Sequence, residues 1–304
     1  MSTKISTSVN IAGVELKNPV MTASGTFGSG AEYSEFVDLS KLGAVVTKGV
    51  ANVPWPGNPT PRVAEVYGGM MNAIGLQNPG IDLFCKRDIP YLKNYDTKII
   101  VNVCGHAPEE YLAVVERLAD EPIDMMEINI SCPNVNAGFL AFGQDAKHVE
   151  ELTAQIKKIA KQPIIMKLTP NVTDITEIAK AAEAGGADAL SLINTLTGMK
   201  IDINRRTFAV ANKTGGVSGP VVHPIAVRMV YQTAQAVNIP IIGMGGIATP
   251  EDAIEMILAG ASAVSVGTAN FYNPNATIEI IDGIEAYMKK NGFESVKDMV
   301  GIVK

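Results

Sequence analysis

A cysteine between two carboxamide side chains is the first group in this chain that could do chemistry. Residues 129–134, Asn-Ile-Ser-Cys-Pro-Asn, directly follow the largely apolar residues 125–128, which predict a buried strand. Enzymes of the α/β class place reactive groups just beyond strand ends. A thiol at Cys132 needs neighbours that orient a substrate, and Asn129 and Asn134 can each donate to and accept from a polar ring. The alternative is a buried cysteine before an ordinary Pro-Asn turn.

Two lysines lie inside apolar runs, where an ammonium group is rarely found without a partner. Lys48 ends the run 44–48, and Lys167 lies within the run 164–168. Such a lysine could hold an anion, form a Schiff base or stand beside an electron-rich ring. The alternative is a side chain that reaches solvent from the end of a strand, which suits Lys48 better than Lys167.

Five asparagines fall at predicted strand ends or on the long segments between strands: Asn72, Asn102, Asn129, Asn134 and Asn194. One such asparagine would indicate a turn. Five on one predicted face indicate recognition of a flat ring rich in amide groups, because a carboxamide can satisfy both donors and acceptors.

Two glycine-rich turns follow the last two predicted strands, at residues 243–247 and 266–270. In (β/α)8 barrels the loops after strands seven and eight commonly bind a phosphate through backbone N–H groups, and glycine allows the close approach. Residues 243–248 also loosely fit a dinucleotide fingerprint. We reject that interpretation because the turn does not open a first βα unit and no acidic residue stands about 20 positions later. The alternative to a phosphate is glycine used only for tight turns.

Eight short apolar runs alternate with segments of helical periodicity, which predicts a (β/α)8 (TIM) barrel; a doubly wound open sheet is the alternative. The surplus length lies after the second, fourth and sixth runs, in segments rich in Gly, Pro and Asn. We expect these segments (53–80, 131–144 and 194–222) to form extended βα loops around the site. The runs are 20–23, 44–48, 99–103, 125–130, 164–168, 189–193, 241–244 and 263–266.

Composition restricts the possible partners. The 304 residues carry a formal net charge of −6, so no excess of basic residues exists to neutralise nucleic acid or an anionic membrane. Three cysteines without metal-site spacing predict neither a disulfide framework nor a metal centre. No apolar run reaches the roughly 18 residues that span a bilayer. We expect one cytoplasmic domain over residues 1–304.

The motifs together resemble those of the dihydroorotate dehydrogenases over essentially the whole chain. The matching segments are 21–26 (MTASGT), 47–49 (TKG), 72–78 (NAIGLQN), 129–134 (NISCPN), 167–171 (KLTPN), 193–195 (INT), 218–220 (SGP) and the two glycine turns. Segments 75–80 and 194–199 are similar to the NAD-linked, two-subunit class. Membrane-bound, quinone-linked relatives carry an N-terminal extension and a serine base, and we expect neither in this protein.

The resemblance implies an FMN enzyme that oxidises (S)-dihydroorotate to orotate in pyrimidine (UMP) synthesis. Cys132 would be the base that removes the C5 proton while flavin N5 accepts a hydride from C6. The residues implied to bind the substrate are Lys48, Asn72, Ala73, Ile74, Gly75, Leu76, Asn129, Asn134, Asn194 and Thr195. Those implied to bind FMN are Ser24, Lys48, Gly49, Asn102, Asn129, Lys167, Ile193, Gly219, Gly245, Gly246, Gly267 and Thr268.

The same resemblance implies a partner subunit that carries FAD and a [2Fe–2S] cluster and delivers electrons to NAD⁺. The barrel chains would form a homodimer within a heterotetramer. The chain itself offers no credible NAD fingerprint, and its three cysteines cannot supply the four ligands that such a cluster usually takes.

Four other functions remain open. A fumarate-linked homodimeric dihydroorotate dehydrogenase differs only in its electron acceptor. A dihydropyrimidine dehydrogenase-type flavoenzyme shares the flavin and the cysteine, but its substrate lacks a carboxylate. A Schiff-base aldolase would use Lys167 without a flavin. A non-catalytic binding barrel would not need a thiol, two lysines and five amides on one face.

Overall fold

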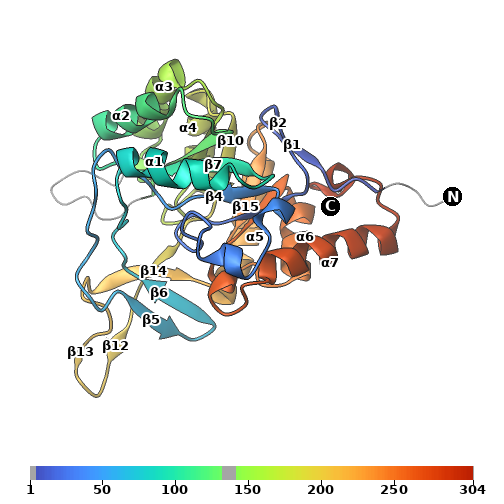
Figure 1. Cartoon of the computed structure of the whole chain (residues 1–304). Coiled ribbons are helices and arrows are strands. Elements are labelled where there is room, and N and C mark those ends of the chain that lie inside the picture. Colours follow the sequence, from blue (N-terminus) through green and yellow to red (C-terminus); the bar gives the residue numbers. More distant parts are fainter. Residues whose placement is uncertain (1–4, 132–141, 304) are drawn as a thin grey trace.

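Eight short parallel strands close into a barrel in the computed structural model, which describes residues 5–131 and 142–303 (Figure 1). Neighbours around the barrel are hydrogen-bonded in the order β10-β15-β16-β3-β4-β7-β8-β9. The strands are β3 (Val20–Thr22), β4 (Ala44–Val46), β7 (Lys98–Val103), β8 (Met125–Asn129), β9 (Ile164–Lys167), β10 (Ala189–Leu192), β15 (Ile241–Met244) and β16 (Ala263–Val266). Each lies within or overlaps a predicted apolar run, so the barrel is confirmed and the open sheet is excluded.

Helices cover the outside of the barrel. They are α1 (Ile81–Leu92), α2 (Pro108–Leu118), α3 (Ala146–Ile159), α4 (Ile175–Ala184), α5 (His223–Ala234), α6 (Pro250–Ala259) and α7 (Ala276–Asn291). Three of these helices, α3, α4 and α6, begin at a residue whose side chain caps the helix. At α6, the Thr249 side chain and the Asp252 side chain form a reciprocal capping box, and Asp145 and Asp174 cap α3 and α4.

The expectation of eight strand–helix pairs is wrong for the first unit. In the fully described segment between β3 and β4 the chain forms two 3₁₀ helices, η1 (Tyr33–Glu35) and η2 (Leu39–Lys41), in place of an α-helix. The segment contains three glycines with positive φ, Gly25, Gly28 and Gly30. These conformations interrupt the regular backbone that an α-helix needs.

An N-terminal hairpin closes one end of the barrel. Strands β1 (Val9–Ile11) and β2 (Val14–Leu16) turn through Ala12 and Gly13, which both have positive φ. The hairpin's buried Ile11 and Leu16 pack in one cluster with inward-facing barrel residues such as Ile100. This end therefore holds an apolar plug, and the opposite end remains for the site.

The surplus segments after β4 and β10 contain strands that the sequence analysis did not predict. Strands β5 (Val63–Val66), β6 (Gly69–Asn72), β11 (Leu196–Met199) and β14 (Thr214–Ser218) form an antiparallel sheet in the order β11-β14-β6-β5. A small hairpin, β12 (Ile201–Asp202) and β13 (Thr207–Phe208), extends from it. In Figure 1 the sheet lies on the other side of the barrel from the β1–β2 hairpin.

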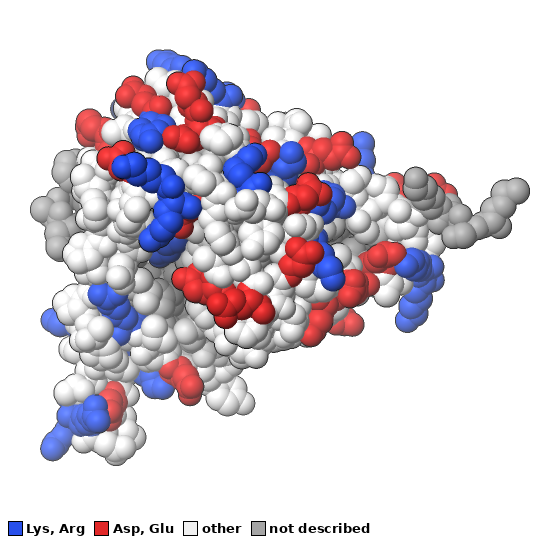
Figure 2. Space-filling view, in the orientation of Figure 1, with Lys and Arg blue, Asp and Glu red and all other residues white. Residues whose placement is uncertain are grey.

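Charged side chains are mixed over the surface. Figure 2 shows Lys and Arg interspersed with Asp and Glu on the face in view, without a continuous basic patch. Among the described helices, none combines the length and the apolar composition that crossing a membrane requires.

Candidate active site

The barrel interior changes from apolar to polar along the strands. Residues of alternate positions point inward, because successive side chains of a strand face opposite sides. On β8 the inward series is Met125, Glu127 and Asn129. Met125 belongs to the apolar interior cluster, Glu127 hydrogen-bonds across to neighbouring strands, and Asn129 lines the cavity above. The polar residues thus lie toward the carboxyl ends of the strands.

Four polar residues from consecutive strands meet in the upper interior layer. Glu127 Oε1 accepts a hydrogen bond from Asn102 Nδ2 (2.6 Å), and Glu127 Oε2 accepts one from Ser191 Oγ (2.8 Å). Lys167 Nζ lies 3.6 Å from Glu127 Oε1. All four residues are buried. The predicted buried lysine therefore has a carboxylate partner that the sequence analysis missed.

Hydrogen bonds fix the rim residues above this layer. Asn129 Oδ1 accepts from Asn194 Nδ2 (3.3 Å) and from the Ser131 backbone N–H (3.2 Å). The Asn129 carbonyl accepts from the Tyr111 hydroxyl (2.9 Å), and Ser131 Oγ donates to the Lys167 carbonyl (3.0 Å). These contacts tie the ends of β8, β9 and β10 together and hold the carboxamides at one edge.

A cavity of about 810 Å³ lies between the carboxyl ends of the strands and the β11-β14-β6-β5 sheet. This volume suits a sizeable organic ligand. Among the residues predicted to bind substrate or cofactor, those that line it are Ser24, Lys48, Asn72, Ala73, Ile74, Gly75, Leu76, Asn129, Lys167, Ile193, Asn194, Thr195, Gly219, Gly245, Gly246, Gly267 and Thr268. Residues of the predicted extended segments 53–80 and 194–222 are among those that line it, whereas most of the segment 131–144 lies outside the described residues.

Two predicted cofactor residues, Gly49 and Asn102, are not among the lining residues and lie in contact with each other. A Cβ at Gly49 would meet Asn102 Oδ1 at 2.7 Å. Asn102 is fully buried, and its Oδ1 has no hydrogen-bond partner within the described part of the chain. Cys132 and Asn134 lie outside the described residues.

The first glycine turn has a backbone that only glycine fits. Gly246 has φ +73°, and a Cβ there would lie 2.7 Å from His223 Cβ and 2.8 Å from the Gly219 carbonyl oxygen. Gly245 has φ +126°, and its carbonyl is within 2.9 Å of His223 Nδ1. The sequence analysis found no role for His223, which is buried against this turn.

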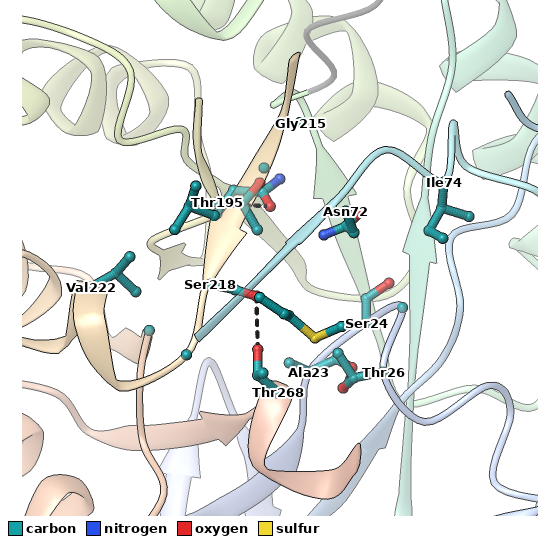
Figure 3. A pocket seen from close by; sticks show the side chains of 18 of the residues that line it. Ala23, Ser24, Thr26, Asn72, Ile74, Thr195, Gly215, Ser218, Val222 and Thr268 are labelled. Atoms are coloured by element: carbon teal, nitrogen blue, oxygen red, sulfur yellow. Dashed lines mark hydrogen bonds between the residues drawn. The ribbon is translucent and has the colours of Figure 1, made fainter. Parts of the chain in front are cut away.

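The second glycine turn faces the antiparallel sheet across the cavity. Thr268 Oγ1 donates to Ser218 Oγ (2.8 Å), and Figure 3 shows this bond among the residues that line the cavity. Asn171, present in a quoted motif but not predicted as a site residue, also lines the cavity. Its Nδ2 donates to the Thr195 carbonyl (3.1 Å) and fixes the start of β11.

Burial raises the pKa of one thiol, Cys85, and of one phenol at the cavity, Tyr272. Burial, with a smaller contribution from the Glu121 carboxylate, raises the pKa of the Cys85 thiol to about 12, so this cysteine stays protonated. At the cavity, burial and then the Asp252 carboxylate raise the pKa of Tyr272, which remains a neutral phenol. The side chains of Cys85 and Cys104 are both buried.

The fold and the cavity define a (β/α)8-barrel protein with its site at the carboxyl ends of the strands, where enzymes of this fold carry out their chemistry. Residues 6–288 match the family described as dihydroorotate dehydrogenase. The chain belongs to the dihydroorotate dehydrogenase family.

Several relatives are similar over nearly their whole length. A "Dihydroorotate dehydrogenase B (NAD(+)), catalytic subunit" of Lachnoclostridium phytofermentans is 68% identical over 300 residues, which cover 99% of this chain and 100% of the relative. Proteins of the same name from Alkaliphilus metalliredigens and Caldicellulosiruptor bescii are 64% and 53% identical, over 98% and 97% of this chain and 99% and 98% of theirs. The resemblance drawn from the motifs is confirmed at the level of the family.

Proposed function

We propose that this chain oxidises (S)-dihydroorotate to orotate in pyrimidine synthesis and that it uses a bound FMN. One observation carries the proposal. In a chain of the dihydroorotate dehydrogenase family, a buried lysine, the three predicted carboxamides Asn72, Asn129 and Asn194, and a glycine turn with positive φ angles converge on one cavity. The relatives are named for this activity and for NAD⁺ as acceptor.

The residues present fit an FMN. The cavity volume of about 810 Å³ is in the range of cofactor sites. Asn102 offers a buried acceptor without a partner in the described chain, which a ligand N–H or O–H could satisfy. Gly245 and Gly246 line the cavity at the carboxyl end of β15, in the region where barrel proteins commonly hold a phosphate through backbone N–H groups.

The chain's own residues would divide the binding as follows. Gly245, Gly246, Gly267 and Thr268 would hold the phosphate, and Lys167 would place a positive charge beside the ring. When bound, FMN supplies the acceptor for the hydride that leaves C6 of the substrate. The carboxamides of Asn72, Asn129 and Asn194 would hold the substrate's ring amides, and Lys48 would pair with its carboxylate.

Cys132 is our proposal for the base that accepts the proton from C5. The residue follows the described Ser131, whose hydroxyl is bonded to the Lys167 carbonyl at the cavity. A positioned base of this kind is typically worth about 10²–10⁴-fold in rate. The proton leaves C5 and the hydride leaves C6, so the ring gains one double bond and two electrons leave with the hydride.

We further propose that a second subunit takes these electrons to NAD⁺. The phrase "catalytic subunit" in the relatives' name supports such a partner. This proposal includes an FAD and a [2Fe–2S] cluster in the second subunit, a homodimer of barrel chains and a cytoplasmic location.

The test is an FMN titration of the purified chain followed by assays with dihydroorotate. We expect one FMN per chain, reduction of artificial dyes, and no reduction of NAD⁺ until the partner is added. Failure of a folded chain to bind FMN would refute the proposal. Rapid turnover with fumarate alone would assign the fumarate-linked homodimeric class, and preference for dihydrouracil would assign the dihydropyrimidine dehydrogenase type.

A further inference from the structure

The barrel interior contains a carboxylate for which the proposed chemistry has no direct use. Glu127 lies on β8, two residues before Asn129, and its side chain is 2% exposed. Its cationic neighbour Lys167, on the adjacent strand β9, is 5% exposed. Two charges are thus removed from water in the layer directly beneath the cavity.

Stability alone does not explain such a pair. Desolvating two ions costs several kcal/mol each, and well-packed apolar residues in their place are often as stable or more stable. The neighbouring lower layer of this barrel is filled in that way, by Met125, Ile165 and other apolar side chains. A retained buried pair therefore points to a function for its charge or its geometry.

Both oxygens of the Glu127 carboxylate accept hydrogen bonds. One accepts from Asn102 Nδ2 (2.6 Å) and the other from Ser191 Oγ (2.8 Å). The first bond fixes the Asn102 amide with its nitrogen toward Glu127. Its oxygen therefore points the other way, next to Gly49, and is the atom that has no partner within the described residues. One carboxylate thus orients two residues proposed to face the cofactor, Lys167 and Asn102.

We propose that Glu127 is a positioning residue that sets the redox preference of the bound flavin. This inference rests on the proposed function, since it concerns the FMN site. The carboxylate holds the Lys167 ammonium group in place and offsets part of its charge. Reduction converts a neutral ring to an anionic one, which Lys167 favours and Glu127 opposes. Glu127 therefore makes the reduced flavin less stable relative to the oxidised flavin, which favours transfer of the electrons to the next acceptor.

The variant that tests this role is Glu127→Gln, which has nearly the same shape and can still accept from Asn102 but carries no charge. The measurement is the midpoint potential of FMN bound to the chain, by dye equilibration at pH 6. We expect at least a tenfold gain in preference for reduced over oxidised flavin, which is a shift of about +30 mV for a two-electron couple. The matched control is Ser191→Ala, which removes a hydrogen bond to the same carboxylate but keeps its charge, and we expect a wild-type potential.

Other results of these measurements would overturn the inference or the proposed function. A folded, FMN-loaded Glu127→Gln chain with the wild-type potential would overturn the inference, and so would an equal shift in Ser191→Ala, because the effect would then be structural. If Glu127→Gln does not fold, the comparison is made between Lys167→Met and the double variant Glu127→Gln/Lys167→Met, which leaves no buried ion unpaired. The double variant should show the same positive shift, and equal potentials would overturn the inference. A wild-type chain that binds no FMN would refute the proposed function instead.

Discussion

Replacing Gly246 by alanine should lower both the free energy of unfolding and the affinity for FMN. The structure allows the two effects to be estimated separately. The residue has φ +73°, a conformation that costs a residue with a Cβ about 1–2 kcal/mol. The new Cβ would also lie 2.8 Å from the Gly219 carbonyl oxygen and 2.9 Å from the His223 backbone nitrogen, and neither backbone atom can move freely. Such overpacking typically costs a further 1–3 kcal/mol.

The total expected loss in the free energy of unfolding is therefore about 2–5 kcal/mol. Gly292→Ala is the matched control, because Gly292 has nearly the same φ of +77° but nothing within 4 Å of its Cβ position. The Gly292→Ala variant should lose only the part of the free energy of unfolding that comes from the positive φ, about 1–2 kcal/mol. Urea unfolding of both variants and the wild type, without added FMN, gives the difference directly.

The same substitution should weaken FMN binding. Displacing the turn removes at least one N–H hydrogen bond to a charged phosphate, worth about 1.5–3 kcal/mol, so the dissociation constant should rise about 10- to 150-fold. Gly292→Ala should bind FMN as the wild type does. Equal stabilities for the two alanine variants, or an unchanged dissociation constant in Gly246→Ala, would refute the role assigned to this turn.

Two further predictions concern the cysteines. Cys132→Ala should slow flavin reduction by dihydroorotate by about 10²–10⁴-fold in rapid mixing while flavin content stays unchanged, whereas Cys104→Ala should have a far smaller effect; wild-type reduction in the Cys132 variant would exclude it as the base. Burial first, then Glu121, raises the pKa of the Cys85 thiol to about 12, above its ordinary value near 8.5. The unfolded chain therefore loses this proton first, so the stability that the thiol contributes is present below about pH 8.5 and is lost as pH rises toward 12. Cys85→Ala should flatten that decline in urea unfolding at pH 8, 9.5 and 10.5, and identical slopes would contradict the assignment.

The barrel and most of the cavity could be predicted because their signals are local. Each barrel strand is a short apolar run, and parallel strands must bring their carboxyl ends to one edge. Residues at or just beyond the carboxyl ends of different runs, such as Lys48, Asn129 and Asn194, therefore had to converge. Gly246 was identifiable because its turn follows the seventh run.

The antiparallel sheet over the cavity could not be predicted in the same way. Its strands β6 and β14 come from segments more than 130 residues apart and pair through residues such as Asn72 and Gly216. Their side chains are mostly half-buried, so neither a clear alternation nor an apolar run marks them. Pairing of this kind is decided by tertiary contacts.

The sequence analysis did not single out Glu127, although its position in the sequence is unusual. It is a lone acid inside an apolar run, and a buried carboxylate requires partners. Those partners, Asn102, Lys167 and Ser191, come from three other strands and become visible only when the barrel closes.

The most direct test of the central claim is an anaerobic titration of the FMN-loaded chain with dihydroorotate. The account predicts that the oxidised flavin band disappears with one equivalent of dihydroorotate per flavin and that an equal amount of orotate forms, with no other protein present. A flavin that is bound and remains oxidised in excess dihydroorotate would contradict the account.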